Sequence, residues 1–386
     1  MSKILHLATD EKFIDAANYI FEKAFPGLNS FLIIQPVSQP PLKYVTLQDN
    51  CIVMRGDDEN LELIVEKANR AELIVLHGFD LYKARLFSRD NFKKKYLWLL
   101  WGAEAYNEQV MHKSFLGKAT KKLSEKISAI TLFDRIKNIY RSIRYKKNEK
   151  DKNIDIANCL NYITYMGILH KEEFLYFKQQ KVINPHSLYI PFTYYPLEFI
   201  FKENTPTVKG KNILLGNSAS FTNNHIEAID LLAKILQQNQ KVIVPLSYGN
   251  SRYAKAVINY GNTKIGAQIQ PLQKFMPLDE YNEILAGCGI VVMNHYRQQA
   301  IGNVLASVYM GAKVFLNNTT VYQYLKRIGC YVFLIEKDLL NHHDLELLTQ
   351  EQANHNRQIL KNEISTSVVV KNLQNSLLGH FDMLNN

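Results

Sequence analysis

Short, continuously apolar segments alternate along this chain with segments of helical periodicity. In the first half, the apolar segments are residues 3–9, 31–36, 73–79, 95–102 and 161–166, and the helical patterns are residues 13–25, 59–70 and 170–180. A strand that is apolar throughout is typical of a parallel sheet whose two faces are both covered. Strands that alternate with helices form βαβ units. The pattern therefore predicts an α/β fold built on a parallel sheet.

The alternation restarts after a segment rich in proline. Residues 189–210 contain Pro191, Pro196 and Pro206, and we interpret them as a linker. Beyond it we expect strands at residues 212–217, 241–248, 267–272, 289–295, 312–317 and 331–336, and helices at residues 224–238, 251–261, 278–288 and 301–311. A chain of 386 residues is too long for one ordinary core. We therefore expect two Rossmann-like, doubly wound domains.

The restart also gives the expected domain boundaries. Residues 1–195 are predicted to form an N-terminal domain and residues 208–360 a C-terminal domain, while residues 361–386 form a helix that could return to the first domain. In open parallel sheets, ligands bind at the carboxyl ends of the strands. The expected functional site is a cleft between the carboxyl edges of the two sheets.

Several classes of protein are disfavoured by composition. No run of about 18 or more uncharged apolar residues occurs, so no membrane-spanning helix is predicted. The N-terminal segment does not read as a secretory signal, and we expect a cytoplasmic protein. The four cysteines are scattered without metal-ligand spacing, so neither a disulfide framework nor a zinc site is predicted.

The net charge of +10 is concentrated in one stretch, residues 112–150, which holds twelve Lys and Arg against three Asp and Glu. Its basic residues include Lys121, Lys122, Arg141 and Arg144, and its apolar residues include Phe115, Leu116, Phe133 and Ile136. The spacing predicts one or two basic amphipathic helices. Such helices either pack on their own domain with a solvated charged face or lie on an anionic membrane. Nucleic acid is the weaker option, because no recognised nucleic-acid-binding motif accompanies the charge.

A loop of small polar residues joins the first strand and helix of the second domain, in the sequence LLGNSASFTNNH, residues 214–225. It contains Gly216, Asn217, Ser218, Asn223 and His225. One interpretation is structural, since Asn, Ser and Thr cap helices and Gly permits a tight turn. The other is chemical, since a polar loop before a helix N-terminus suits a phosphate. Both interpretations remain open from the residues alone.

Two further polar loops follow strands of the second domain. The first, VPLSYGNSRY, places Tyr248 directly after a strand; the second, NHYRQQAIGN, contains Arg297, Gln298, Gln299, Ile301 and Gly302. A guanidinium beside helix amides can hold a diphosphate, although Arg297 could instead pair with a surface carboxylate. There is no GxxxxGK[ST] loop and no DxD in these loops, so neither ATP hydrolysis nor a metal-bridged diphosphate is expected.

In the first domain, His77 and Glu104 are the titratable groups best placed at strand ends, and Trp101 lies beside Gly102. Either titratable group could deprotonate an acceptor hydroxyl. Their structural alternatives are a hydrogen-bonded histidine at a strand end and a carboxylate at a helix N-terminus. Trp98 and Trp101 are expected mainly as core residues, and of the two Trp101 is the better candidate platform for an acceptor sugar.

Five segments, in order, resemble one enzyme family. They are HGF near residue 77, LWLLWGAEAY (97–106), ILLGNSASFTNNHIEAI (213–229), VIVPLSYGN (242–250) and YRQQAIGN (296–303), followed by GAKVFLN. Together they resemble the family 56 glycosyltransferases. These are the TDP-N-acetylfucosamine:lipid II N-acetylfucosaminyltransferases, or 4-alpha-L-fucosyltransferases, of enterobacterial common antigen assembly. The GNS loop followed by Asn-x-His and the RQQ-x-IG element are the more specific motifs.

The resemblance implies a GT-B-type fold and transfer of a 6-deoxy-amino sugar, of the Fuc4NAc type, from a dTDP-sugar donor to a polyprenyl-diphosphate-linked glycan acceptor. It also implies a peripheral enzyme on the inner face of the bacterial cytoplasmic membrane, with an anionic membrane surface as a partner. No cofactor, metal or nucleic acid is expected. The chain departs from the family where Glu104 replaces a usual Asp and Ala300 replaces a Gly, and its basic stretch is longer. The alternatives are a GT-B-like sugar-nucleotide epimerase and a non-catalytic basic scaffold at the membrane.

Overall fold

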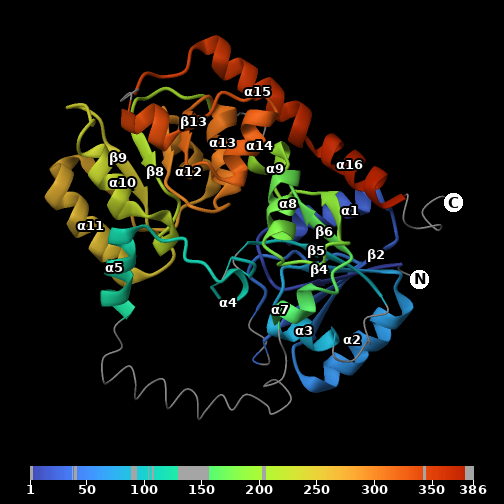
Figure 1. The fold of residues 1–386 in the computed structure, drawn as a ribbon. Helices are drawn as coiled ribbons and strands as arrows, with labels where there is room; N and C mark the ends of the chain where they lie inside the picture. Colours follow the sequence, from blue (N-terminus) through green and yellow to red (C-terminus); the bar gives the residue numbers. More distant parts are fainter. Residues whose placement is uncertain are drawn as a thin grey trace. The chain divides into compact units, whose positions relative to one another are not determined.

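The structure of the protein is a computed structural model that describes residues 3–36, 38, 41–87, 94–102, 104–106, 108–128, 156–201, 206–341 and 345–378 (Figure 1). The chain divides into two compact units. Unit 1 comprises Met1–Lys113, Arg141–Phe199 and Glu363–Asn386, and unit 2 comprises Ser114–Tyr140 and Ile200–Asn362. Each unit is described by itself.

The described strands of unit 1 form a seven-stranded sheet in the order β3-β2-β1-β4-β5-β6-β7, with every pairing parallel. The strands are β1 (Ile4–Ala8), β2 (Asn29–Gln35), β3 (Cys51–Arg55), β4 (Leu73–His77), β5 (Lys95–Leu99), β6 (Tyr165–Ile168) and β7 (Leu188–Pro191). The helices assigned to unit 1 are α1 (Ile14–Ala24), α2 (Asp58–Arg70), α3 (Leu81–Phe87), α4 (Glu108–Met111), α7 (Ile156–Leu160), α8 (Lys171–Gln179) and α16 (Thr366–Leu378).

The C-terminal helix α16 belongs to unit 1. It contributes Val369, Leu373 and Leu377 to the hydrophobic cluster that contains Phe21 of α1. Gln374 Nε2 also donates to the carbonyl oxygen of Ala24, at 2.9 Å. Helix α16 therefore completes part of the core of the unit 1 sheet.

The described strands of unit 2 form a six-stranded sheet in the order β10-β9-β8-β11-β12-β13, again with parallel pairings. The strands are β8 (Ile213–Leu215), β9 (Val242–Pro245), β10 (Ile269–Leu272), β11 (Ile290–Met293), β12 (Lys313–Leu316) and β13 (Phe333–Leu334). The described α-helices are α5 (Lys118–Ser128), α10 (His225–Leu232), α11 (Ser251–Ile265), α12 (Leu278–Ala286), α13 (Ile301–Met310), α14 (Thr320–Arg327) and α15 (Gln350–Ile364), of which α15 extends two residues into unit 1. Helix α9 (Leu197–Ile200) lies where the chain passes from unit 1 to unit 2.

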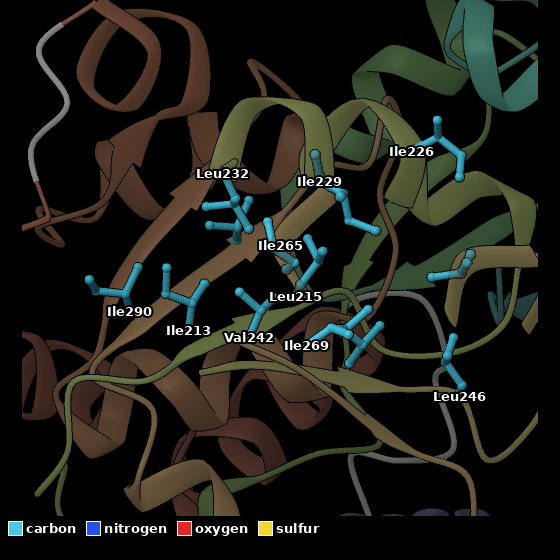
Figure 2. Close-up of a cluster of buried hydrophobic side chains, with 14 of the residues drawn as sticks. Ile213, Leu215, Ile226, Ile229, Leu232, Val242, Leu246, Ile265, Ile269 and Ile290 are labelled. Carbon is cyan, nitrogen blue, oxygen red and sulfur yellow. The ribbon is translucent and has the colours of Figure 1, made fainter. Parts of the chain in front are cut away.

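One hydrophobic cluster of unit 2 lies between its sheet and the helices on one face (Figure 2). Ile213 and Leu215 of β8 and Val242 of β9 pack with Ile229 and Leu232 of α10, and all five are fully buried. Two polar loops, after β8 and β9, leave the sheet at its carboxyl edge. The apolar strands thus bring those loops to one side of the unit.

Three strands differ from the sequence-based expectations. Strand β3 was not expected, and β7 overlaps the start of the segment interpreted as a linker. The strand expected at residues 331–336 is only Phe333–Leu334, because a π-helix begins at Ile335.

The basic amphipathic segment also differs from expectation. Of its described part, residues 112–128, residues 114–128 belong to unit 2, so the expected continuous domain 1–195 is interrupted. Leu123 and Ile127 of α5 pack against the unit 2 core, and Phe115 is only 4% exposed. The prediction that Phe115 meets a membrane is therefore wrong, because the protein itself covers this side chain. Lys121 and Lys122 are exposed.

Four other residues proposed for this surface, namely Phe133, Ile136, Arg141 and Arg144, lie outside the described residues. Within the described residues, no helix has both the length and the apolar character needed to cross a membrane.

Candidate active site

The loop after β8, residues 216–225, is held together by the side chain of Asn223. Its Nδ2 donates to the carbonyl oxygens of Ser218 (3.0 Å) and Ser220 (3.3 Å). Its Oδ1 therefore faces the other way and accepts from the backbone N–H of Asn217, at 2.9 Å. Gly216 adopts φ +68°, and a Cβ there would lie 2.6 Å from Asn223 Oδ1. Only glycine fits this turn without displacing Asn223.

Two buried histidines adjoin this loop. His295, after β11, contacts Asn223 Oδ1 through Nε2 at 2.8 Å, and since that oxygen only accepts, His295 carries its proton on Nε2. His225, the first residue of α10, has Nδ1 3.2 Å from the hydroxyl of Tyr253, while its Nε2 is buried and makes no hydrogen bond within the described residues. Burial lowers the pKa of both histidines to about 3. Both are therefore neutral at pH 7.

The turn before α13 carries the arginine. Ala300 precedes helix α13 and adopts φ +56°, a left-handed conformation that favours glycine. This conformation accounts for the glycine that the RQQ-x-IG element usually has at this position. The first helical bond runs from Val304 N to Ala300 O, which leaves the amides of Ile301 and Gly302 without an intrahelical acceptor. Arg297 Nη1 donates to the carbonyl oxygen of Gln298, at 2.9 Å.

Side-chain hydrogen bonds join the loops that follow β8, β9 and β11 at the carboxyl edge of the unit 2 sheet. Gln299 donates to Asn217 Oδ1 (3.2 Å) and accepts from Thr222 (2.6 Å). Asn217 donates to the hydroxyl of Tyr248, at 2.9 Å, and Tyr248 is 56% exposed. Residues predicted as donor-binding from three separate loops thus meet at one carboxyl edge.

In unit 1, His77 lies at the end of β4 and is completely buried. A chain of hydrogen bonds fixes its protons, starting from Asn29, whose Nδ2 donates to the carbonyls of Phe21 and Phe25. Asn29 Oδ1 must then accept from His6 Nε2 (3.1 Å), so His6 Nδ1 accepts from His77 Nε2 (3.0 Å).

The chain continues towards Trp101. His77 Nδ1 accepts from the Tyr194 hydroxyl (3.0 Å), and the oxygen of Tyr194 accepts from Trp101 Nε1 (3.2 Å). Burial lowers the pKa of His77 well below its usual value, with smaller effects from His6 and Lys83. Both ring nitrogens of His77 make hydrogen bonds, and the side chain is completely buried. These features are those of a structural, hydrogen-bonded histidine at a strand end.

Glu104 is partly buried after β5, and its Oε1 accepts the backbone N–H of Trp101 at 2.8 Å. Burial raises the pKa of Glu104, and the Trp101 N–H offsets part of that rise. Trp101 packs directly over Gly78, where a Cβ would lie 2.6 Å from the indole. Of the two predicted candidates for the base, His77 is completely buried, whereas the Glu104 residue is only partly buried.

Tyr194, His6 and Asn29 help to hold these sites together and were not predicted from the sequence. Asn224 and Asn294 belong to the predicted polar loops, but their role in positioning neighbouring residues was not predicted. The buried positions of Asn224 and Asn294 are indicated by no periodicity, although both belong to polar loops. In the described residues, no group of three or more His, Cys, Asp or Glu could hold a metal ion.

Two parallel Rossmann-like sheets with interleaved helices, each with polar loops at a carboxyl edge, define a GT-B-type protein. A family model described as 4-alpha-L-fucosyltransferase, glycosyl transferase group 56, matches residues 167–375. The chain belongs to this family and is a glycosyltransferase.

Solved structures of similar fold cover nearly the whole chain. HepE from Anabaena, in complex with UDP and glucose, is 13% identical with a TM-score of 0.62, covering 98% of this chain and 100% of that one. A glycosyltransferase from Rickettsia africae is 13% identical, TM-score 0.59, covering 98% and 99%. Sucrose-phosphate synthase from Thermosynechococcus elongatus is 10% identical, TM-score 0.59, covering 98% and 100%. At these identities the likeness concerns the fold alone.

Proposed function

We propose that this glycosyltransferase transfers a 6-deoxy-amino sugar, of the Fuc4NAc type, from a dTDP-sugar to a polyprenyl-diphosphate-linked saccharide during synthesis of a cell-surface glycan such as enterobacterial common antigen. The family supports the reaction class and a fucose-like sugar. The observation that carries the proposal is the convergence of the loops after β8, β9 and β11 on one edge of unit 2.

The donor diphosphate binds at this edge. Arg297 supplies a fixed positive charge, and the free amides of Ile301 and Gly302 supply donors at the positive end of the α13 dipole. Gly216, Asn217 and Ser218 bring the polar loop after β8 beside them. HepE was solved with UDP-glucose, which supports a sugar nucleotide as the donor class.

Glu104 deprotonates the acceptor hydroxyl. Its raised pKa places the carboxylate nearer to the working pH, where a general base is more effective. Substitution Glu104→Gln should lower turnover by about 10²–10⁴-fold, whereas Glu104→Asp, which restores the residue usual in the family, should retain most of it. Near-normal turnover in Glu104→Gln would place the base elsewhere.

Attachment to the membrane is electrostatic. Because the apolar face of α5 is packed against unit 2, its exposed face offers Lys121 and Lys122 to anionic headgroups, with each basic residue worth about 1 kcal/mol. Vesicles containing phosphatidylserine should bind the parent protein at low salt and release it at about 1 M, where the Debye length falls to about 3 Å.

A double charge reversal tests the assignment to α5. Lys121→Glu with Lys122→Glu should reduce co-sedimentation with those vesicles, and the control, Lys361→Glu with Lys371→Glu on α15 and α16, should not. Equal release by both pairs would mean that net charge alone governs binding.

A transfer assay tests the function. Purified protein is incubated with labelled dTDP- and UDP-sugars and a membrane extract of polyprenyl-diphosphate-linked saccharides, with and without EDTA. We expect label in the lipid fraction with a dTDP-6-deoxy-amino sugar, and no loss in EDTA. Interconversion of the donor sugars without transfer would instead indicate an epimerase, and no turnover of any donor would indicate a scaffold.

A further inference from the structure

Segment 115–120, which leads into α5, is built into the donor edge of unit 2. The backbone N–H of Gly117 donates to Asn224 Oδ1 at 2.8 Å, and Asn224 Nδ2 donates to the carbonyl oxygen of Phe115 at 3.2 Å. Thr120 donates to Glu227 through both its backbone N–H (2.9 Å) and its hydroxyl (2.6 Å). These contacts join residues about a hundred positions apart in the chain.

Asn224 also holds the turn that leads to Arg297. Its Nδ2 donates to the carbonyl of Asn294 (3.1 Å), and Asn294 Nδ2 donates back to the carbonyl of Asn224 (3.1 Å). Asn317 then donates to Asn294 Oδ1 (2.9 Å) and to the carbonyl of His295 (3.1 Å). A single carboxamide therefore connects segment 115–120 with the backbone just before Arg297.

The geometry leaves little freedom at this junction. Asn224 is fully buried and adopts φ +49°, a left-handed conformation that asparagine tolerates better than most residues. A Cβ on Gly117 would overlap the carboxylate of Glu227, which cannot withdraw without breaking its two bonds to Thr120. Segment 115–120 can seat in this way only with glycine at position 117.

We infer that Gly117 and Asn224 are positioning residues for the sugar-nucleotide donor. Seating of segment 115–120 on Asn224 fixes the Asn294–Arg297 turn and the amides that follow it. The inference rests on the proposed donor site at Arg297. Neither Gly117 nor Asn224 contacts the donor, and they act on its affinity through the position of that turn.

The test compares Gly117→Ala and Asn224→Gly with the parent. Asn224→Gly tolerates the left-handed conformation and removes the whole side chain, including the carboxamide. Both variants should raise the KM for the dTDP-sugar roughly threefold to tenfold, the effect of one or two lost hydrogen bonds, and leave kcat and the acceptor KM within about twofold. Ala119→Ser, which adds one atom at an exposed position of the same segment, is the control and should change nothing.

The outcomes separate this inference from the proposed function. A merely structural role would lower the melting temperature and the active fraction, hence apparent kcat, with the donor KM unchanged, and would overturn the inference. If Gly117→Ala does not fold, Thr120→Val, which removes one hydroxyl bond to Glu227, should still raise the donor KM, and an unchanged value would also overturn it. If Arg297→Ala weakens donor binding and these variants do not, the inference alone fails. If Arg297→Ala has no effect, the proposed donor site fails.

Discussion

Substitution Tyr194→Phe removes the central hydroxyl of the hydrogen-bond chain in unit 1. That oxygen accepts from Trp101 Nε1 (3.2 Å) and donates to His77 Nδ1 (3.0 Å). Phenylalanine fits the same volume, so no cavity forms. The change leaves one acceptor on a completely buried histidine without a partner, and it frees the indole N–H of a partly buried tryptophan.

The expected loss of stability comes from His77 Nδ1 and the indole N–H of Trp101. A buried polar atom left unsatisfied costs about 1–3 kcal/mol, and the indole N–H, which is nearer to solvent, costs less. We therefore expect the free energy of unfolding of unit 1 to fall by about 2–4 kcal/mol. The indole should also become more mobile and more accessible to acrylamide.

Tryptophan fluorescence reports both effects. The chain has two tryptophans, Trp98 and Trp101, and both belong to unit 1, so urea unfolding followed by their emission reports that unit. In a Trp98→Phe background, emission and quenching report Trp101 alone. The control Tyr19→Phe, at a side chain that is 45% exposed, should change stability by less than about 0.5 kcal/mol. A similarly small loss in Tyr194→Phe, with unchanged quenching, would refute the hydrogen-bond chain as an ordering element.

Three further predictions follow from buried or left-handed positions. The folded-state pKa values of His6, His225 and His295 are about 3, below the unfolded value of about 6.5, so the unfolded chain binds more protons between these limits. Urea titrations should therefore show stability rising from pH 5 to pH 7 and then levelling, and equal stability at both would contradict buried neutral histidines. Gly216→Ala forces a Cβ to within 2.8 Å of His225 Nε2 at φ +68° and should cost about 1–3 kcal/mol in thermal unfolding, with weaker donor binding; a wild-type melting temperature would contradict it. Ala300→Gly relieves a left-handed alanine at φ +56° and should stabilise by about 0.5–1 kcal/mol, so a lower melting temperature would count against the assigned conformation.

Continuously apolar strands were predictable from the sequence because both faces of a parallel sheet are buried. The two missed strands lie at the edges of the unit 1 sheet, where that pattern weakens. Only Met54 of strand β3 is buried, and β7 ends at Pro191, a residue that an edge strand tolerates. A prediction that requires both faces of a strand to be apolar therefore misses edge strands.

The convergence of the three loops that we propose to bind the donor was largely predictable, because parallel topology brings the carboxyl ends of β8, β9 and β11 together. The packing of α5 against unit 2 could not be predicted, because an apolar helix face has the same sequence pattern whether it contacts a membrane or its own protein. The partners that settle it, Asn224 and Glu227, lie 107 residues from Gly117 and Thr120. The hydrogen-bond chain around His77 likewise joins residues that only the fold brings into contact.

The affinity of the Arg297→Ala variant for dTDP tests the central claim most directly. Loss of a charge-assisted contact should weaken binding by about tenfold to a hundredfold in calorimetry, while Lys326→Ala, which removes an exposed charge from α14, should bind as the parent does. An unchanged dissociation constant for Arg297→Ala would contradict a donor site at the carboxyl edge of unit 2.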